Sequence, residues 1–221
     1  MDTLNAVQSK AMLIYIADKV IAGKAYLTEI DSAIGDGDHG IGMAGGMQKA
    51  KDKLKKQDFE SAYDVFAAAG KAMLMSMGGA SGVIFGSLYL AGAKGMEPKA
   101  ELTAEDLAGM MRKSLDAIKE RGKAQVGDKT MVDALEPAVL AMEETYQCGL
   151  LEMLKQAEEA AAGGLEDTKK YIAKFGRAKS LMERAVGHQD AGATSVWLIF
   201  QGMREFVKTG EQQYPSGADA R

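Results

Sequence analysis

The chain has 221 residues, of which 47% are hydrophobic and 26% are charged, and its formal net charge is −4. This length can bury a full-sized core, and the charge balance lacks the basic excess typical of nucleic-acid binding, so we expect a soluble globular protein with no nucleic-acid partner. With one cysteine, Cys148, no signal-like N-terminus and no apolar run near the roughly 20 residues of a spanning helix, we expect a cytoplasmic protein without disulfide or membrane segment.

Helical periodicity is the main secondary-structure signal. Apolar residues recur at three- and four-residue spacing from Asn5 onward, and this first helix is expected to end at Gly23. The same spacing predicts further helices over 59–77, 81–94, 104–121, 131–146, 150–162 and 192–208. Thr103 and Thr130 each precede an acid by three residues, a relative of the capping box that marks a helix start.

Hardly any window alternates with period two, so the predicted fold class is all-α. Short connections favour an antiparallel bundle or barrel of amphipathic helices. The sequence shows no internal repeat and no linker rich in proline or serine. We therefore expect one domain over residues 1–209, followed by a loose C-terminal tail over 210–221.

The ten residues 34–43, IGDGDHGIGM, hold two carboxylates, a histidine and four glycines. Their G-x-G-x-x-G spacing fits a dinucleotide fingerprint, but Asp36 and Asp38 occupy its variable positions and would repel a diphosphate. A calcium-binding EF-hand loop fails as well, because the sixth and twelfth positions counted from Asp36 are Ile41 and Met47. A cation between the carboxylates and a phosphate would turn this repulsion into a bridge.

Three acids within eight residues, Asp31, Asp36 and Asp38, therefore suggest a Mg²⁺ site beneath a phosphate group. Mg²⁺ prefers oxygen ligands and is commonly held by one or two carboxylates together with substrate phosphates. The intervening glycines permit backbone angles that would let the oxygens face one point. A solvated acidic turn explains the same spacing equally well.

Two more glycine-bearing loops lead into predicted helices. MGGASG, residues 77–82, offers free N–H groups and the Ser81 hydroxyl to an anion. RGKAQVGDKTM, residues 121–131, approaches a phosphate-binding P-loop, but Asp128 interrupts the pattern and no strand precedes it. Each stretch taken alone is also explained by a simple turn between helices.

The last such stretch, GRAKSLMERAVGHQDAGATS at residues 176–195, gathers basic side chains ahead of a helix. Its His188, taken alone, is better explained by a structural role. Alternate loops of an up-and-down bundle share one end, so all four loops could meet there. Together they would offer acids for Mg²⁺ and N–H, arginine and histidine groups for a nucleotide, and phosphoryl transfer needs little else.

The four stretches, in this order and at this spacing, resemble the ADP-binding L subunit of dihydroxyacetone kinase, the DhaL family, from about residue 5 to residue 207. The family implies a barrel of about eight antiparallel helices with the nucleotide bound at one end. It also implies glycerone kinase activity, in which a phosphoryl group passes from an ATP/ADP coenzyme with about two Mg²⁺ ions to dihydroxyacetone.

By this resemblance, Asp31, Asp36 and Asp38 would hold the Mg²⁺ ions, and no catalytic base is needed because the transfer is metal-assisted. The residues that would contact the phosphates are His39, Gly40, Ile41, Gly42, Ala80 and Ser81. The residues that would line the nucleoside or the pocket rim are Gly122, Met131, Arg177, Asp190, Ala191 and Gly192. Gly42 departs from the family, because bacterial L subunits usually have Asn there.

ATP-dependent family members carry a substrate domain in the same chain, and we expect this chain to lack one, so it resembles the phosphotransferase-system type. There, a separate K subunit holds dihydroxyacetone on its own histidine. A phosphohistidine protein, the M-type subunit, recharges the bound ADP. Neither His39 nor His188 would then bind the substrate. A homodimer, ATP as donor and a role for Cys148 stay open.

Three other functions fit the sequence. A kinase subunit for another small ketose, such as a four-carbon keto-sugar, would use the same nucleotide chemistry with a different K partner. A nucleotide-sensing module would bind without turnover, and a helical bundle with acidic turns would bind nothing. Fatty acid kinases use a similar helical domain but carry Thr at the position of His39, which disfavours that assignment.

Overall fold

A computed structural model describes residues 2–213 of the chain. Within this stretch nine α-helices carry the fold: α1 (Ala6–Ala22), α2 (Lys24–Ile34), α3 (His39–Lys55), α4 (Ala62–Ser76), α5 (Gly79–Ala93), α6 (Ala104–Gly122), α7 (Val132–Thr145), α8 (Leu150–Asp167) and α9 (Ala191–Gln213). Short 3₁₀ segments are η1 (Tyr146–Cys148), η2 (Thr168–Lys170) and η3 (Arg177–Ala185). The all-α prediction is confirmed.

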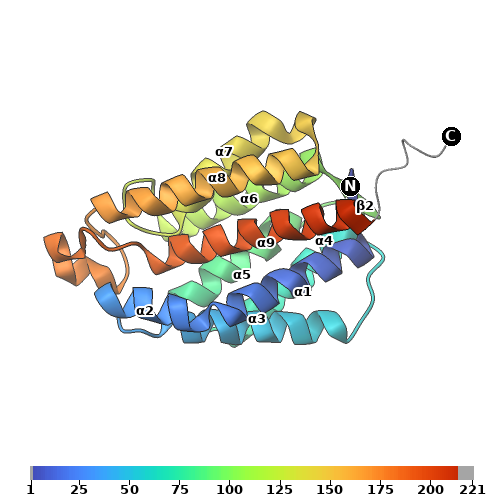
Figure 1. The fold of residues 1–221 in the computed structure, drawn as a ribbon. Coiled ribbons are helices and arrows are strands. Elements are labelled where there is room, and N and C mark those ends of the chain that lie inside the picture. Colours follow the sequence, from blue (N-terminus) through green and yellow to red (C-terminus); the bar gives the residue numbers. More distant parts are fainter. Residues whose placement is uncertain (1, 214–221) are drawn as a thin grey trace.

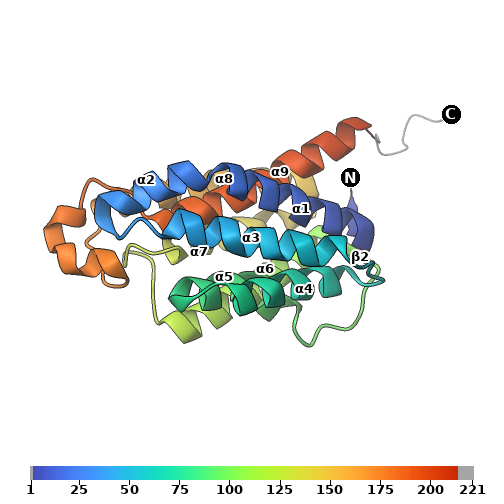
Figure 2. The same ribbon diagram turned by 90° about the horizontal axis from the view of Figure 1, so that it is seen from below.

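The long helices lie side by side and close into a ring. Each helix from α3 to α9 packs on the next one along the chain, and α1 packs on both α3 and α9 (Figures 1 and 2). α1 and α2 run end to end, because hydrogen bonds continue across Gly23, from its N–H to Lys19 and from Leu27 to its carbonyl. The nine helices therefore form an eight-rod antiparallel barrel, which is the expected architecture.

The ring closes around a core of aliphatic side chains and methionines. In α6, residues at three- and four-residue spacing are almost fully buried, namely Leu107, Met110, Met111, Leu115 and Ile118. Each such side chain contributes about 1.5–3 kcal/mol when it is removed from water. Glycine lets the helices approach closely: a Cβ on Gly70 of α4 would lie 2.6 Å from the Gly86 carbonyl oxygen of α5.

The periodic segments fold as predicted, but the periodicity did not mark α2 and α3, and the small sheet was not expected. α2 and the glycine-rich α3 fill the interval that the periodicity left without helix. β1 (Thr3–Asn5) pairs antiparallel with β2 (Glu101–Thr103). The capping box at Thr103 and Asp106 is confirmed. At Thr130 only part of the box forms, with the Asp133 carboxylate accepting from the Thr130 N–H at 2.6 Å while α7 begins at Val132.

The four glycine-bearing loops lie at one end of the barrel, at the left of Figure 1, and β2 and the start of α1 lie at the other. α9 continues to Gln213, so the first residues of the expected loose tail, 210–213, are helical. Residues 214–221 lie outside the described residues. Among the described helices, none combines the length and apolarity that crossing a membrane requires.

Candidate nucleotide and metal site

The three acids of the first loop come together. Asp31 lies in the last turn of α2, and Asp36 and Asp38 lie in the turn before α3. One carboxylate oxygen from each lies within 4.8 Å of the other two. Gly37, with φ +75°, turns the chain between the two loop acids, a conformation that glycine adopts without strain. The spacing in the sequence therefore becomes a carboxylate cluster facing one point.

The cluster carries more negative charge than its surroundings balance. The pKa of Asp38 is raised by burial first and then by the carboxylates of Asp36 and Asp31, whereas Arg177 lowers it. The Arg177 Nε lies 2.8 Å from Asp36 Oδ2 and is the cation that reaches this cluster from η3. The carboxylates repel one another, and a bound cation would relieve this repulsion. Oxygen ligands of this kind suit a hard divalent metal ion.

His39 begins α3 and is held by three other elements. Its N–H donates to Asp31 Oδ2 at 3.2 Å, and its Nε2 lies 2.8 Å from Ser195 Oγ of α9. The ring lies 5.8 Å from the ring of Phe85 in α5. Burial lowers the pKa of His39 against the opposing effect of Asp31, which favours the neutral imidazole. His39 therefore ties α3 to α9 beside the acids.

Open glycine backbone lies at the same end of the barrel as the acid cluster. A Cβ on Gly42 of α3 would meet no atom within 4 Å, and the same holds for Gly78, the N-cap of α5, and for Gly79, its first residue. A Cβ on Gly46 would lie 2.2 Å from Met77 Sδ, so α3 packs directly against this second loop. α5 begins without a side-chain cap and without an acid in its first turn, which holds the exposed Ala80 and Ser81. Free N–H groups at such a helix start suit a phosphate.

The predicted nucleoside and rim residues fall into two groups. Met131 is 6% exposed and lies against Gly192, where an added Cβ would come within 3.3 Å of the Met131 Cβ. Gly122 ends α6 with Ile84 of α5 nearby, 3.5 Å from an added Cβ. The structure thus joins the third loop to the start of α9 and to α5.

Asp190 caps the start of α9, accepting from the Ala193 N–H at 2.8 Å. Its pKa is raised to about 7, chiefly by burial. Ala191, the first residue of α9, is buried beneath this cap, whereas Ile41 of α3 is exposed. The implied site residues therefore lie at the loop end of the barrel, although Gly40, Ala191 and Met131 are buried and offer little surface to a ligand.

Residues that the sequence reading did not single out also shape this end. Ser195 and Phe85 hold His39, and no local pattern in the sequence pointed to either. Lys129, which made the third loop look like a P-loop, is 2% exposed and turns inward. It is therefore not placed to bind a phosphate from solvent.

Comparison with known proteins agrees with this geometry. The DAK2 domain family matches residues 33–205. The chain is 38% identical over 84% of its length, and 89% of the relative, to the ADP-binding subunit DhaL of the PEP-dependent dihydroxyacetone kinase 1 of Listeria innocua. It is also 38% identical, over 80% of its length and 85% of the relative, to the corresponding DhaL of Escherichia coli.

A solved structure shares the fold. The dihydroxyacetone kinase from C. freundii, determined in complex with AMP-PNP and Mg²⁺, superposes with a TM-score of 0.68 at 25% identity. The match covers 93% of this chain but only 34% of that longer chain. The family match over most of the chain, the two DhaL relatives and the shared fold show that this chain belongs to the DAK2 domain family, among the DhaL-type subunits of dihydroxyacetone kinase.

Proposed function

We propose that the chain is the nucleotide-binding subunit of a dihydroxyacetone kinase in which a phosphohistidine protein recharges the bound nucleotide. The observation that carries the proposal is the carboxylate cluster of Asp31, Asp36 and Asp38 beside the open glycine backbone. The relatives from Listeria innocua and Escherichia coli, which are named PEP-dependent, support this type of donor. The acceptor would be dihydroxyacetone on a separate K subunit, with an M-type subunit as donor.

The residues present fit Mg²⁺ and a diphosphate. The three carboxylates would hold two Mg²⁺ ions, which neutralise phosphate charge when bound. The N–H groups at the start of α5, with Ala80 and Ser81, would bind phosphate oxygens. Ser81, His39 and Arg177 come from three different elements, α5, α3 and η3, and together they would orient the phosphates. Catalysis would then rest on positioning and charge neutralisation, and no residue need act as a general base.

The nucleoside would lie on the other side of the phosphates. Gly122 and Met131 would line its base, and the start of α9, with Asp190 and Gly192, would complete the pocket. The close approach of Met131 to Gly192 supports this arrangement, because it holds the third loop against α9. Ile41, which is exposed in the first turn of α3, would lie at the phosphates with Gly40 and Gly42.

The proposal is tested by the nucleotide that the protein retains. The protein would be purified without added nucleotide and denatured, and the released ADP and Mg²⁺ would be quantified by chromatography and elemental analysis. We expect close to one ADP and about two Mg²⁺ per chain, the arrangement that suits two phosphates and three carboxylates. A protein that emerges empty and does not bind Mg·ADP would refute the nucleotide site.

Variants locate the site on the chain. Asp36→Ala and Asp38→Ala should lose bound nucleotide, whereas Asp52→Asn should retain it, because Asp52 lies near the opposite end of α3 and bonds Gln48. Either cluster variant retaining stoichiometric ADP would remove that acid from the site. Adding a K subunit and a phosphoryl donor should give multiple turnovers, and their absence would favour a nucleotide-sensing module.

A second acceptor is favoured by another group of relatives. The chain is 34% identical, over 89% of its length and 35% of the relative, to the D-erythrulose kinase of Mycolicibacterium smegmatis. Because the acceptor would be held by the K partner, the same assay run with erythrulose and dihydroxyacetone distinguishes the two substrates.

A further inference from the structure

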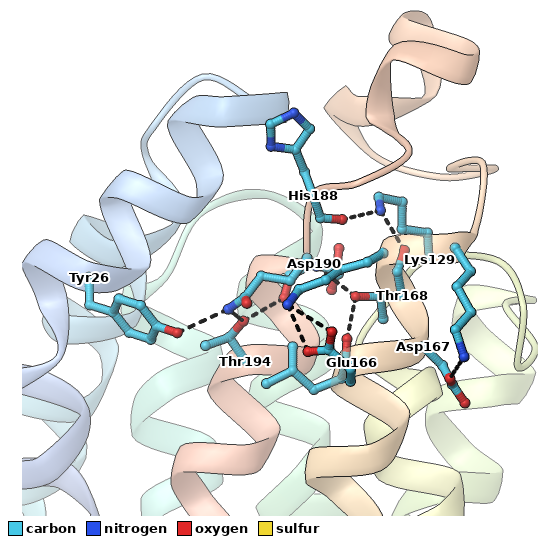
Figure 3. A network of polar contacts seen from close by, with 12 residues as sticks. Tyr26, Lys129, Glu166, Asp167, Thr168, His188, Asp190 and Thr194 are labelled. Carbon is cyan, nitrogen blue, oxygen red and sulfur yellow. Dashed lines mark hydrogen bonds and ion pairs between the residues drawn. The ribbon is translucent and has the colours of Figure 1, made fainter.

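Lys129 is a charged side chain that the fold buries almost completely. It is 2% exposed, and its ammonium donates to the Thr168 carbonyl at 2.6 Å and to the His188 carbonyl. Figure 3 shows the ammonium at these two carbonyls, with the His188 imidazole pointing away from it. Burial lowers the pKa of Lys129, and the carboxylates of Asp190 and Asp133 oppose this effect. Lys129 is thus a buried cation that joins backbone from two places in the chain.

The two carbonyls mark the ends of one long connection, the α8–α9 segment, which we define as residues 169–189. Thr168 precedes the segment and His188 lies near its end. The Thr168 side chain also accepts from the Asp190 N–H at 3.0 Å. The departing and returning arms therefore lie side by side, and Lys129 fastens both of them to the loop before α7.

The α8–α9 segment carries groups that reach the acid cluster. Arg177, within the segment, pairs with Asp36. Gln189, at its end, donates to the Tyr26 hydroxyl of α2 at 3.1 Å, and α2 is the helix that supplies Asp31. A shift at the base of the segment would therefore move Arg177 relative to the acids.

We propose that Lys129 is a positioning residue for nucleotide binding, clamping both ends of the α8–α9 segment so that Arg177 and the start of α9 face the acid cluster. The inference deepens the proposed function and rests on it. Lys129 acts through the backbone that it holds, because its buried ammonium has no route to a ligand at the surface.

The chemistry of the contacts explains why a lysine occupies this position. One ammonium has three N–H donors on a flexible stem, so it can satisfy two carbonyls from different segments at once. An apolar side chain would leave both carbonyls without this donor, which costs free energy at a buried site. A buried charge would be a poor choice for stability alone, since well-packed apolar residues often replace buried ions without loss. The buried Lys129 therefore indicates that the protein requires the α8–α9 segment to be held in one position.

A matched pair of variants separates the clamp from a general effect on the loop. Lys129→Met removes the donors and keeps the chain length, and Lys129→Gln keeps N–H donors without the charge. Lys174→Met is the control, because Lys174 joins the same segment to the same loop through Asp128 at 2.6 Å but is 67% exposed. ADP release would be timed by displacement of a fluorescent ADP, and amide hydrogen exchange would be followed in the nucleotide-free proteins.

We expect Lys129→Met to release ADP about ten- to a hundredfold faster than the wild type, because it loses a charge-assisted hydrogen bond. The release rate of Lys129→Gln should lie between those of Lys129→Met and the wild type. Lys174→Met should change the rate by less than about threefold, because the Lys174 ammonium is solvated and the buried Asp128 carboxylate still accepts from the Gln125 N–H at 2.8 Å. Exchange in Lys129→Met should rise in residues 169–189 and stay unchanged in α4 and α5. The affinity of the acid cluster for Mn²⁺, measured by electron paramagnetic resonance, should fall no further in Lys129→Met than in Lys174→Met.

The outcomes separate this inference from the proposed function. A wild type that binds no ADP would refute the nucleotide site, and exchange in residues 169–189 would still test the clamp. A Lys129→Met protein with wild-type ADP release and exchange would overturn the clamp. Faster exchange throughout the barrel would also overturn it, because Lys129 would then serve only global stability. If Lys129→Met does not fold, Lys129→Gln gives the same comparisons with Lys174→Met.

Discussion

Gly40 lies where α3 crosses α2, next to the acid cluster, and its replacement tests how tightly the site depends on that crossing. A Cβ on Gly40 would lie 2.4 Å from the Lys24 carbonyl oxygen and 2.6 Å from the Thr28 N–H nitrogen. Both neighbours are backbone atoms of a helix, so they cannot turn aside. Because an ordinary contact begins at 3.4 Å, Gly40→Ala must separate the two helices by about 1 Å.

The cost of this separation follows from known effects of overpacking. Inserting a methyl group into a filled space costs about 1–3 kcal/mol. For a chain of this size each kcal/mol lowers the melting temperature by about 2–4 °C, so Gly40→Ala should melt about 2–12 °C below the wild type. The matched control is Gly45→Ala in the same helix, where an added Cβ meets nothing within 4 Å. This variant should gain about 0.5–1 kcal/mol, because alanine has the higher helix propensity.

The assay is thermal unfolding of both variants by far-UV circular dichroism, followed by titration with Mn²⁺. Gly40→Ala should also weaken Mn²⁺ binding, since it moves Asp31 on α2 away from Asp38 at the start of α3, whereas Gly45→Ala should not. If both variants melt at the same temperature, the close crossing is not what holds the two helices. If Gly40→Ala is destabilised but binds Mn²⁺ as well as the wild type, the acid cluster does not depend on the crossing.

Two further predictions concern the other loops of the site. The pKa of Asp190, raised to about 7 from an ordinary 3.8, means that the folded protein holds this proton more tightly than the unfolded chain. Its contribution to stability is therefore complete below pH 3.8 and falls as the pH rises towards 7. In that pH range, the free energy of unfolding of the wild type in urea, measured relative to Asp190→Asn, should fall by at most about 1.4 kcal/mol per pH unit. A constant difference would contradict the raised pKa. Gly42→Asn should fold normally, because an added Cβ meets nothing within 4 Å, and should slow ADP release about two- to tenfold by adding a hydrogen-bond donor. If Gly42→Asn releases ADP at the wild-type rate, position 42 makes no contact with the nucleotide.

Much of the candidate site could be read from the sequence, because its acids are close along the chain. Asp31, Asp36 and Asp38 lie within eight residues, and the Gly37 turn needs no distant partner to bring their oxygens together. The contacts between loops could not be read in this way. His39 meets Ser195 across 156 positions of the chain, and Arg177 meets Asp36 only because η3 folds back over the barrel end.

By itself the sequence determined the helices with strong apolar periodicity, such as α6 and α9, and the capping box at Thr103, because those signals are local. Tertiary structure decided α3, whose glycines disfavour an isolated helix. Its buried residues, among them Met43 and Met47, pack between α1 and α4, and this burial outweighs the helix propensity. Tertiary structure also decided the role of Lys129, since a Lys-Thr pair in a glycine-bearing loop resembles a phosphate ligand, whereas the fold buries Lys129 against the α8–α9 segment.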